Sequence, residues 1–251
     1  MSGVLSGMFG VGGAIVTTPG IRLVLGGSAM DAVATPLVGV IPSSITGAYR
    51  YIKSGITDWR FGLAVGLGGG LLGMVGALVA TKLGGTVVMI GTAAVLILSA
   101  GQTFWNIFKK DNKDGGTQDG QEAVAHTRKN YAKAVGIGAL SGLYAGFFGL
   151  GGGVIIVPAL NRFLKMNYKQ AIGTSLMSIS IISVPALAMH AYLGNVNWML
   201  ALGLVIGVVP GAWLGAKITV GASERATSIG FAVLLIATGI WLAVSEVLGL
   251  R

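Results

Sequence analysis

Apolar runs long enough to cross a lipid bilayer follow one another along nearly the whole chain. A membrane-spanning helix needs about 20 predominantly apolar residues. Runs near this length cover residues 31–53, 59–81, 84–108, 132–162, 170–193, 198–219 and 226–249. Charged residues make up only 10% of the 251 residues, whereas soluble domains carry roughly 25%. The sequence therefore predicts an all-α polytopic membrane protein, placed in a bacterial or archaeal plasma membrane.

The composition also excludes several classes of protein. The chain has no cysteine, which rules out disulfides, iron–sulfur clusters and thiol catalysis. Its net charge of +9 is the bias expected of cytoplasmic loops, so no nucleic-acid partner is inferred. Residues 1–25 lack a basic region before an apolar stretch, and no signal peptide is expected there.

The chain resembles itself at an offset of 139 residues. At this offset GMFGVGGAIVTTP, which begins at Gly7, aligns without a gap with GFFGLGGGVIIVP, which begins at Gly146. Further matched pairs are Ala32 and Ala171, Thr35 and Thr174, Gly55 and Gly194, and Trp59 and Trp198. We therefore predict two tandem repeats at residues 1–108 and 131–251, joined by a polar linker at 109–130.

The length of the second glycine-containing segment bears on the topology. Residues 131–162 would form a single helix of roughly 48 Å, too long for a ~30 Å hydrocarbon core and too short for two crossings. If both glycine segments are re-entrant, 14 of the 17 Lys and Arg residues fall on one side, as the positive-inside rule expects. We therefore predict inverted repeats, each a re-entrant broken helix plus three spanning helices, with the linker in the cytoplasm. An arrangement in which both glycine segments cross fully stays open.

The duplicated glycine clusters predict two interrupted helices. Glycine costs a helix interior about 1 kcal/mol relative to alanine, and a helix that restarts after a break presents free N–H groups to an anion. The residues expected to bind an anion in this way are Gly10, Gly12, Gly13, Gly149, Gly151, Gly152 and Gly153. Close helix packing is the alternative use of membrane glycines, and we assign it to GLGGGLLG at 66–73. That stretch contains G-x-G-x-x-G, but no strand precedes it and no dinucleotide is expected.

The duplicated motif, the A-x-G-T-S-L stretch at 171–176 and the G-x-x-x-W turn at 194–198 resemble the TauE/SafE sulfite exporter family of membrane transporters. The resemblance covers nearly the whole chain. It implies a small anionic sulfur compound as the substrate: sulfite, sulfoacetate or another organosulfonate. The family's second-half motif falls on Gly149, Gly151, Gly152, Gly153, Pro158, Thr174 and Ser175. The first half departs from it, because Ala14 stands at the position of Gly153 and Pro36 at that of Ser175.

Hydroxyl side chains after each cluster are further candidates for anion contacts. They are Thr17, Thr18, Thr35, Ser43 and Ser44 in the first half, and Thr174, Ser175, Ser178 and Ser180 in the second. Bonding to the carbonyl one turn earlier is the ordinary role of such residues in membrane helices, so the matched pair Thr35 and Thr174 is preferred. His190 is a candidate proton carrier, with a hydrogen bond to a carbonyl as the alternative.

The eight carboxylates lie at the ends of the apolar runs or in the linker. Their positions argue against a carboxylate cation site, a carboxylate proton relay, a membrane-embedded metalloenzyme and an aspartyl protease. No metal, no cofactor and no enzymatic activity are expected. We therefore predict a secondary transporter that works by alternating access. Export is favoured because an anion leaves a negative interior downhill, by about 2.3 kcal/mol per charge per 100 mV. An anion-selective channel and a non-transporting membrane subunit are the alternatives, and a homo-oligomer stays open.

Overall fold

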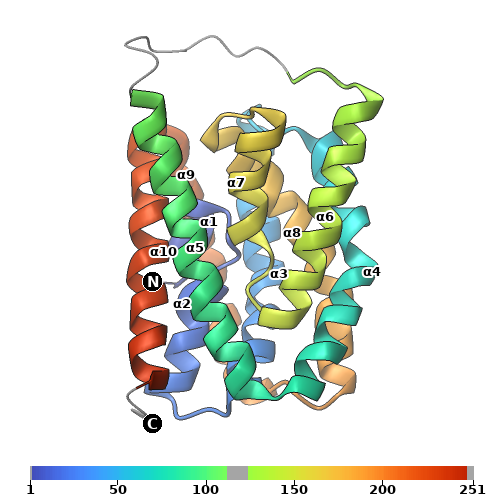
Figure 1. The fold of residues 1–251 in the computed structure, drawn as a ribbon, viewed down its shortest axis with the longest axis vertical. Helices are drawn as coiled ribbons and strands as arrows, with labels where there is room; N and C mark the ends of the chain where they lie inside the picture. Colours follow the sequence, from blue (N-terminus) through green and yellow to red (C-terminus); the bar gives the residue numbers. More distant parts are fainter. Residues whose placement is uncertain (1, 112–123, 248–251) are drawn as a thin grey trace.

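Helices make up nearly all of the described part of the chain. The computed structural model describes residues 2–111 and 124–247. In this part there are ten α-helices and one π-helix, most of them aligned with the long axis of the molecule (Figure 1). They are α1 Ser2–Phe9, α2 Ala14–Pro19, the π-helix η1 Gly20–Val24, α3 Ala29–Lys53, α4 Trp59–Leu83, α5 Gly85–Asp111, α6 Arg128–Phe148, α7 Gly153–Leu164, α8 Tyr168–Tyr192, α9 Trp198–Gly221 and α10 Glu224–Val247.

Five of these helices are long and apolar enough to cross a membrane. They are α3, α4, α8, α9 and residues 224–241 of α10, while Val87–Ser99 of α5 and Gly153–Leu164 are shorter apolar stretches. Large apolar side chains stand exposed on the outer faces, such as Leu67 and Leu71 on α4 and Leu202 and Ile206 on α9. Such surfaces are stable against lipid and not against water. The predicted multi-pass, all-helical class is confirmed.

Side-chain caps fix where the four central helices begin. Ser28 and Asp31 form a capping box at α3, and Asp58, Asn167 and Asn197 cap α4, α8 and α9. Each cap satisfies one backbone N–H that has no partner within its helix and contributes about 1 kcal/mol. The loops between spans are therefore short and end at defined residues.

Glycines let the backbones of α4 and α6 approach closely. A Cβ placed on Gly142 would collide with the backbone of Gly69, and one on Gly146 with the backbone of Gly73. On the other side of the molecule Gly7 of α1 packs against Ala212 of α9 in the same manner. Helix α4 itself runs unbroken from Trp59 to Leu83, so the glycines at 66–73 serve packing, as predicted from their apolar context.

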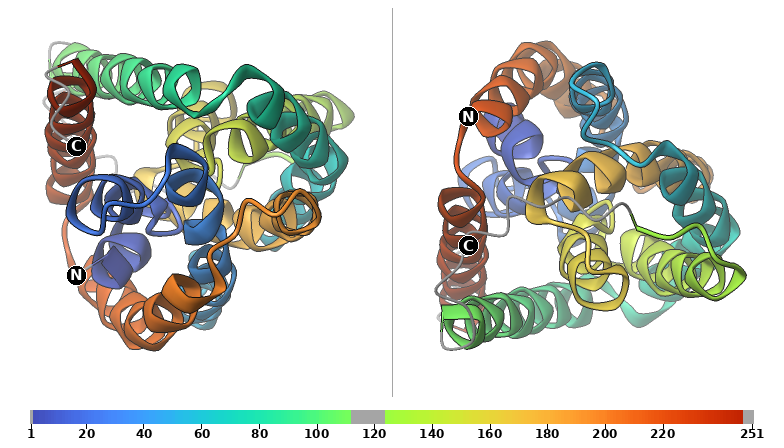
Figure 2. Two further views of the ribbon diagram at one scale, coloured as in Figure 1. Left: turned by 90° about the horizontal axis from the view of Figure 1, so that it is seen from below. Right: turned by 90° about the horizontal axis from the view of Figure 1, so that it is seen from above.

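The central helices form a compact group to which α5 and α10 are attached at one edge. Helix α4 packs on α6 and α8, α9 packs on α1 and α3, and α3 contacts α8. Helices α5 and α10 pack chiefly on each other, and both end views place them together at one side (Figure 2). The glycine clusters therefore lie within the central group.

The run at 132–162, expected to be divided, forms two helices that fold back on each other. Helix α6 leads away from the end of the molecule where α5 ends, and α7 returns to that end (Figure 1). Lys133 near the start of α6 donates from Nζ to the carbonyl oxygen of Phe163 near the end of α7, at 3.2 Å. Helix α2 and η1 lead instead toward the opposite end, where α3 begins (Figure 1).

The predicted linker at 109–130 is helical at both of its ends. Helix α5 continues to Asp111 and α6 begins at Arg128. Residues 112–123 lie outside the described part of the chain. Residues 124–127 have no regular secondary structure.

Candidate functional site

Both glycine clusters interrupt a helix with the same backbone conformation. In the first, φ is 71° at Gly10, 71° at Gly12 and 81° at Gly13. In the second, φ is 69° at Gly149, 72° at Gly151 and 83° at Gly152. A residue with a side chain is destabilised by roughly 1–2 kcal/mol in this left-handed region. Glycine is therefore required at these six positions by the course of the backbone.

A new helix starts directly after each break. The carbonyl oxygen of Gly13 accepts the N–H groups of Val16 and Thr17, both at 3.3 Å, as α2 begins. The carbonyl oxygen of Gly152 accepts those of Ile155 and Ile156, at 3.1 and 3.0 Å, as α7 begins. The earlier N–H groups of a first turn have no acceptor within their own helix and carry a partial positive charge.

The two breaks touch each other. A Cβ on Gly153 would collide with the carbonyl oxygen of Gly10 and lie 2.7 Å from the Cα of Val11. Ser175 of α8 donates from Oγ to the carbonyl oxygen of Gly10, at 2.9 Å. Residues of the second half thus hold the break of the first half in place.

Two aliphatic side chains enclose the contact. The side chain of Val40 on α3 lies 2.7 Å from where a Cβ of Gly12 would stand and 3.1 Å from that of Gly151. Ile179 on α8 lies 3.2 Å from the corresponding point of Gly151. Residues 9–15 and 149–154 are all buried. The structure is therefore closed around the two breaks.

Three serines stand beside the breaks, and two of them were not predicted. Ser43 donates from Oγ to the carbonyl oxygen of Gly12 at 3.2 Å, and accepts from Ser6 Oγ at 3.2 Å. Ser141 of α6 is fully buried, its Cβ lies 3.5 Å from the Cβ position of Gly152, and its hydroxyl has no hydrogen-bond partner among the described residues. An unpaired buried hydroxyl is costly, so Ser141 has hydrogen-bonding capacity to offer a ligand.

The two matched threonines bind loops with their hydroxyl oxygens. Thr35 Oγ1 accepts the backbone N–H of Asn197 at 3.1 Å, and Thr174 Oγ1 accepts that of Asp58 at 3.2 Å. Each bond joins a helix of one half to the loop before α9 or α4 in the other half. In this closed structure the hydroxyl oxygens of Thr35 and Thr174 therefore each accept a hydrogen bond that connects the two halves of the chain.

Most other candidate hydroxyls bond to carbonyls nearby in their own helix. The pairs are Thr17 with Gly13, Ser44 with Ile41, Ser178 with Thr174 and Ser180 with Met177. Ser178 also donates to the carbonyl of Gly62 on α4. Thr18 is buried and its hydroxyl has no partner in the described part of the chain.

His190 is fully buried and binds the helix that leads into the second break. Its Nε2 lies 2.8 Å from the carbonyl oxygen of Gly146, and its Nδ1 lies 3.2 Å from Nδ2 of Asn195. A carbonyl oxygen only accepts, so Nε2 carries a hydrogen, and Nδ1 accepts from the Asn195 amide. These two bonds suit the neutral ring. Tyr51 makes the corresponding contact in the first half, donating from its hydroxyl to the carbonyl of Gly7 at 3.3 Å.

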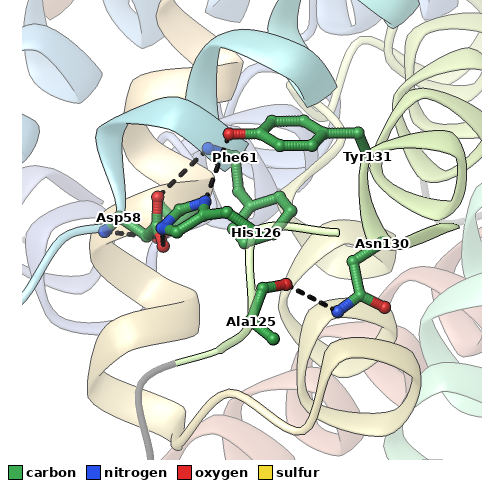
Figure 3. Close-up of polar contacts among 7 residues, drawn as sticks. Asp58, Phe61, Ala125, His126, Asn130 and Tyr131 are labelled. Atoms are coloured by element: carbon green, nitrogen blue, oxygen red, sulfur yellow. Dashed lines mark hydrogen bonds and ion pairs between the residues drawn. The ribbon is translucent and has the colours of Figure 1, made fainter. Parts of the chain in front are cut away.

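His126, near the end of the linker, contacts residues that lie beside Thr174. His126 Nε2 lies 3.5 Å from a carboxylate oxygen of Asp58, its ring stacks on Phe61 at 5.0 Å, and its Nδ1 lies 3.1 Å from the hydroxyl of Tyr131 (Figure 3). Asp58 is the residue whose N–H binds Thr174. The segment that precedes α6 is therefore connected through Asp58 to α8.

Within residues 2–111 and 124–247 no three His, Asp or Glu side chains gather as metal ligands.

The spanning helices and the buried contact between two broken helices define a polytopic helical membrane protein. The sequence profile of the family described as "Sulfite exporter TauE/SafE" matches residues 1–242. The chain belongs to this family, and it is a membrane transporter, not an enzyme.

The relatives extend over most of the chain. The "Probable membrane transporter protein YunE" of Bacillus subtilis is 29% identical over 234 residues, which cover 87% of this chain and 83% of the relative. A "Probable membrane transporter protein" of Xylella fastidiosa (strain Temecula1) is 27% identical over 242 residues, covering 95% and 90%. No solved structure matches the chain.

Proposed function

We propose that the chain is a secondary transporter that exports small sulfur-containing anions such as sulfite, sulfoacetate or other organosulfonates. The observation that carries the proposal is the contact between the two glycine breaks, where Gly153 abuts Gly10 and Ser175 binds the Gly10 carbonyl. The family name supports sulfite or a related anion as the substrate.

The proposed site binds an anion without a cationic side chain. The first-turn N–H groups of α2 and α7 supply partial positive charge where the breaks meet. Ser141 offers a hydroxyl with no partner in the described chain, while Ser175 and Ser43 hold the carbonyls of Gly10 and Gly12 in place beside it. Short neutral donors of this kind match the oxygens of a sulfite or sulfonate group.

We further propose that residues 1–108 and 131–251 are inverted repeats, with the two breaks re-entrant from opposite sides. The near-equal φ angles at Gly10 and Gly149 support this. So do contacts that recur at the offset of 139: Tyr51 to Gly7 and His190 to Gly146, and the two threonine bonds to the loops before α4 and α9. In such transporters a midplane site is exposed alternately as one repeat moves against the other.

The distribution of the basic residues and the negative charge of the substrate favour export. With the linker in the cytoplasm, the basic residues gather on the inner side, and an anion leaving a negative interior needs no coupling ion. His190 then serves to hold α6 against α8, and carrying a proton would require it to release Gly146 or Asn195.

The test is transport by the purified chain in liposomes. A thermal-shift screen with sulfite, sulfoacetate, taurine, thiosulfate and sulfate first selects the anion that stabilises the protein. Liposomes loaded with that unlabelled anion are then given the labelled one outside. A carrier gives saturable uptake by counterflow, a channel gives current without counterflow, and a non-transporting subunit gives neither. Either of the last two results would refute the proposal.

A further inference from the structure

A groove on the lipid-facing surface lies between α3 and α9, away from the glycine breaks. Its volume is about 520 Å³, and it is lined by Thr46 of α3 and by Val209, Pro210, Trp213 and Leu214 of α9. Thr46 already donates its hydroxyl to the carbonyl of Pro42, at 2.7 Å. The groove therefore presents almost purely apolar surface.

Two cations converge at one end of this groove. The guanidinium carbon of Arg50 lies 4.8 Å from the centre of the Trp213 ring, and Nζ of Lys217 lies 5.7 Å from it. Arg50 stands one turn after Thr46 on α3, and Lys217 one turn after Trp213 on α9. Both are thus near the C-terminal ends of their helices, at the end of the molecule where α5 ends and α6 begins (Figure 1).

Neither cation is neutralised within the described part of the chain. No carboxylate there is within ion-pair distance of Arg50 or Lys217, and Nε of Arg50 is buried without a hydrogen-bond acceptor. Two like charges beside one indole repel each other, and a buried donor without an acceptor is costly. An anion with several oxygens would relieve both costs.

We propose that this groove binds an anionic phospholipid. The phosphodiester lies between Arg50 and Lys217, and one acyl chain follows the groove past Trp213 and Leu214 toward Thr46. The order of the features along the helices fits a membrane lipid, because the charged end is at the membrane surface and the apolar part is deeper. With the linker in the cytoplasm, as proposed above, this lipid belongs to the inner leaflet. A zwitterionic lipid would fill the groove equally well but would leave the two positive charges without compensation.

The test compares a groove variant with a matched control in the full chain. Arg50→Gln/Lys217→Gln removes the two groove cations. Lys53→Gln/Arg60→Gln removes two cations near the same end, neither of which lies over Trp213. Arg60 lies instead over the ring of Trp59, at 5.4 Å. Each protein is taken from mixed micelles with equal amounts of phosphatidylglycerol and phosphatidylethanolamine, and its bound lipid is measured by native mass spectrometry.

In the original chain and in the control, the ratio of bound phosphatidylglycerol to bound phosphatidylethanolamine should be about 30, because each of the two groove cations attracts an anionic lipid. The groove variant should lose most of this preference. Equal retention of both lipids by the original chain, or equal loss in both variants, would overturn the proposal. So would a dimer of the original chain that dissociates in the groove variant, because a second copy would then occupy the groove.

A second measurement does not depend on folding of the charge variant. Phosphatidylglycerol with brominated acyl chains should quench the tryptophan fluorescence of the original chain more strongly than phosphatidylethanolamine with the same brominated chains. In Trp213→Phe most of this difference in quenching should be lost. Quenching that is the same for both headgroups would overturn the proposal.

Discussion

Replacing Gly153 with alanine tests the contact between the two breaks. Gly153 lies in the first turn of α7 with ordinary helical geometry, so alanine meets no backbone strain there and would gain up to about 1 kcal/mol of helix propensity. Its methyl group would instead collide with the carbonyl oxygen of Gly10 and the backbone of Val11. Overpacking of this kind costs about 1–3 kcal/mol, and it falls on rigid backbone that no side-chain rotation relieves.

Gly207→Ala is the matched control, because Gly207 is helical in α9 and a Cβ there has no neighbour within 4 Å. We expect Gly207→Ala to keep or raise the thermal stability in detergent and to keep counterflow. Gly153→Ala should lower the stability relative to this control by about 1–3 kcal/mol, because the gain in helix propensity is common to both variants and only the collision differs, and it should abolish counterflow. If both variants are equally stable and equally active, the breaks do not meet in the functional protein.

Three further variants test the contacts around the breaks. Ser175→Ala should destabilise the chain by about 1 kcal/mol through the loss of a buried hydrogen bond and reduce anion binding, whereas Ser180→Ala, whose hydroxyl bonds within its own helix, should change neither in a thermal-shift titration. His190→Phe should lower the melting temperature, because a buried carbonyl loses its donor at a cost of about 1–3 kcal/mol; an unchanged temperature would contradict that role. Asp58→Asn keeps the helix cap and removes only the carboxylate charge beside His126, whose side chain is exposed to solvent. Chemical denaturation should therefore detect a change of under about 1 kcal/mol, and a larger loss would contradict this assignment.

Much of the fold was predictable because the membrane imposes simple constraints on the sequence. A spanning helix must be about 20 apolar residues long, so the apolar runs locate α3, α4, α8 and α9 closely. Glycines at Gly149, Gly151 and Gly152 are hard to reconcile with one continuous helix, and α6 indeed ends at Phe148.

The neighbours of the breaks were harder to predict. The offset of 139 aligns equivalent residues but does not tell which residues face each other across the two halves, so the contact of Gly153 with Gly10 could not be located. Ser141 corresponds at this offset to Ser2, before the first glycine motif, so the repeat gives no reason to select it. The match between Thr35 and Thr174 favours them as anion ligands, but a match is equally expected of residues that bind equivalent loops. The duplication itself remains a prediction.

The central claim, that the two glycine breaks together bind an anion, is tested most directly by locating the anion. Selenite resembles sulfite in shape and charge, and selenium scatters X-rays anomalously. In crystals of the protein soaked with selenite, we predict an anomalous peak beside residues 149–154 and the hydroxyl of Ser141, on the side that faces residues 10–13. A peak found only elsewhere, such as beside Arg50 and Lys217, in a protein that carries selenite across liposomes would contradict the account.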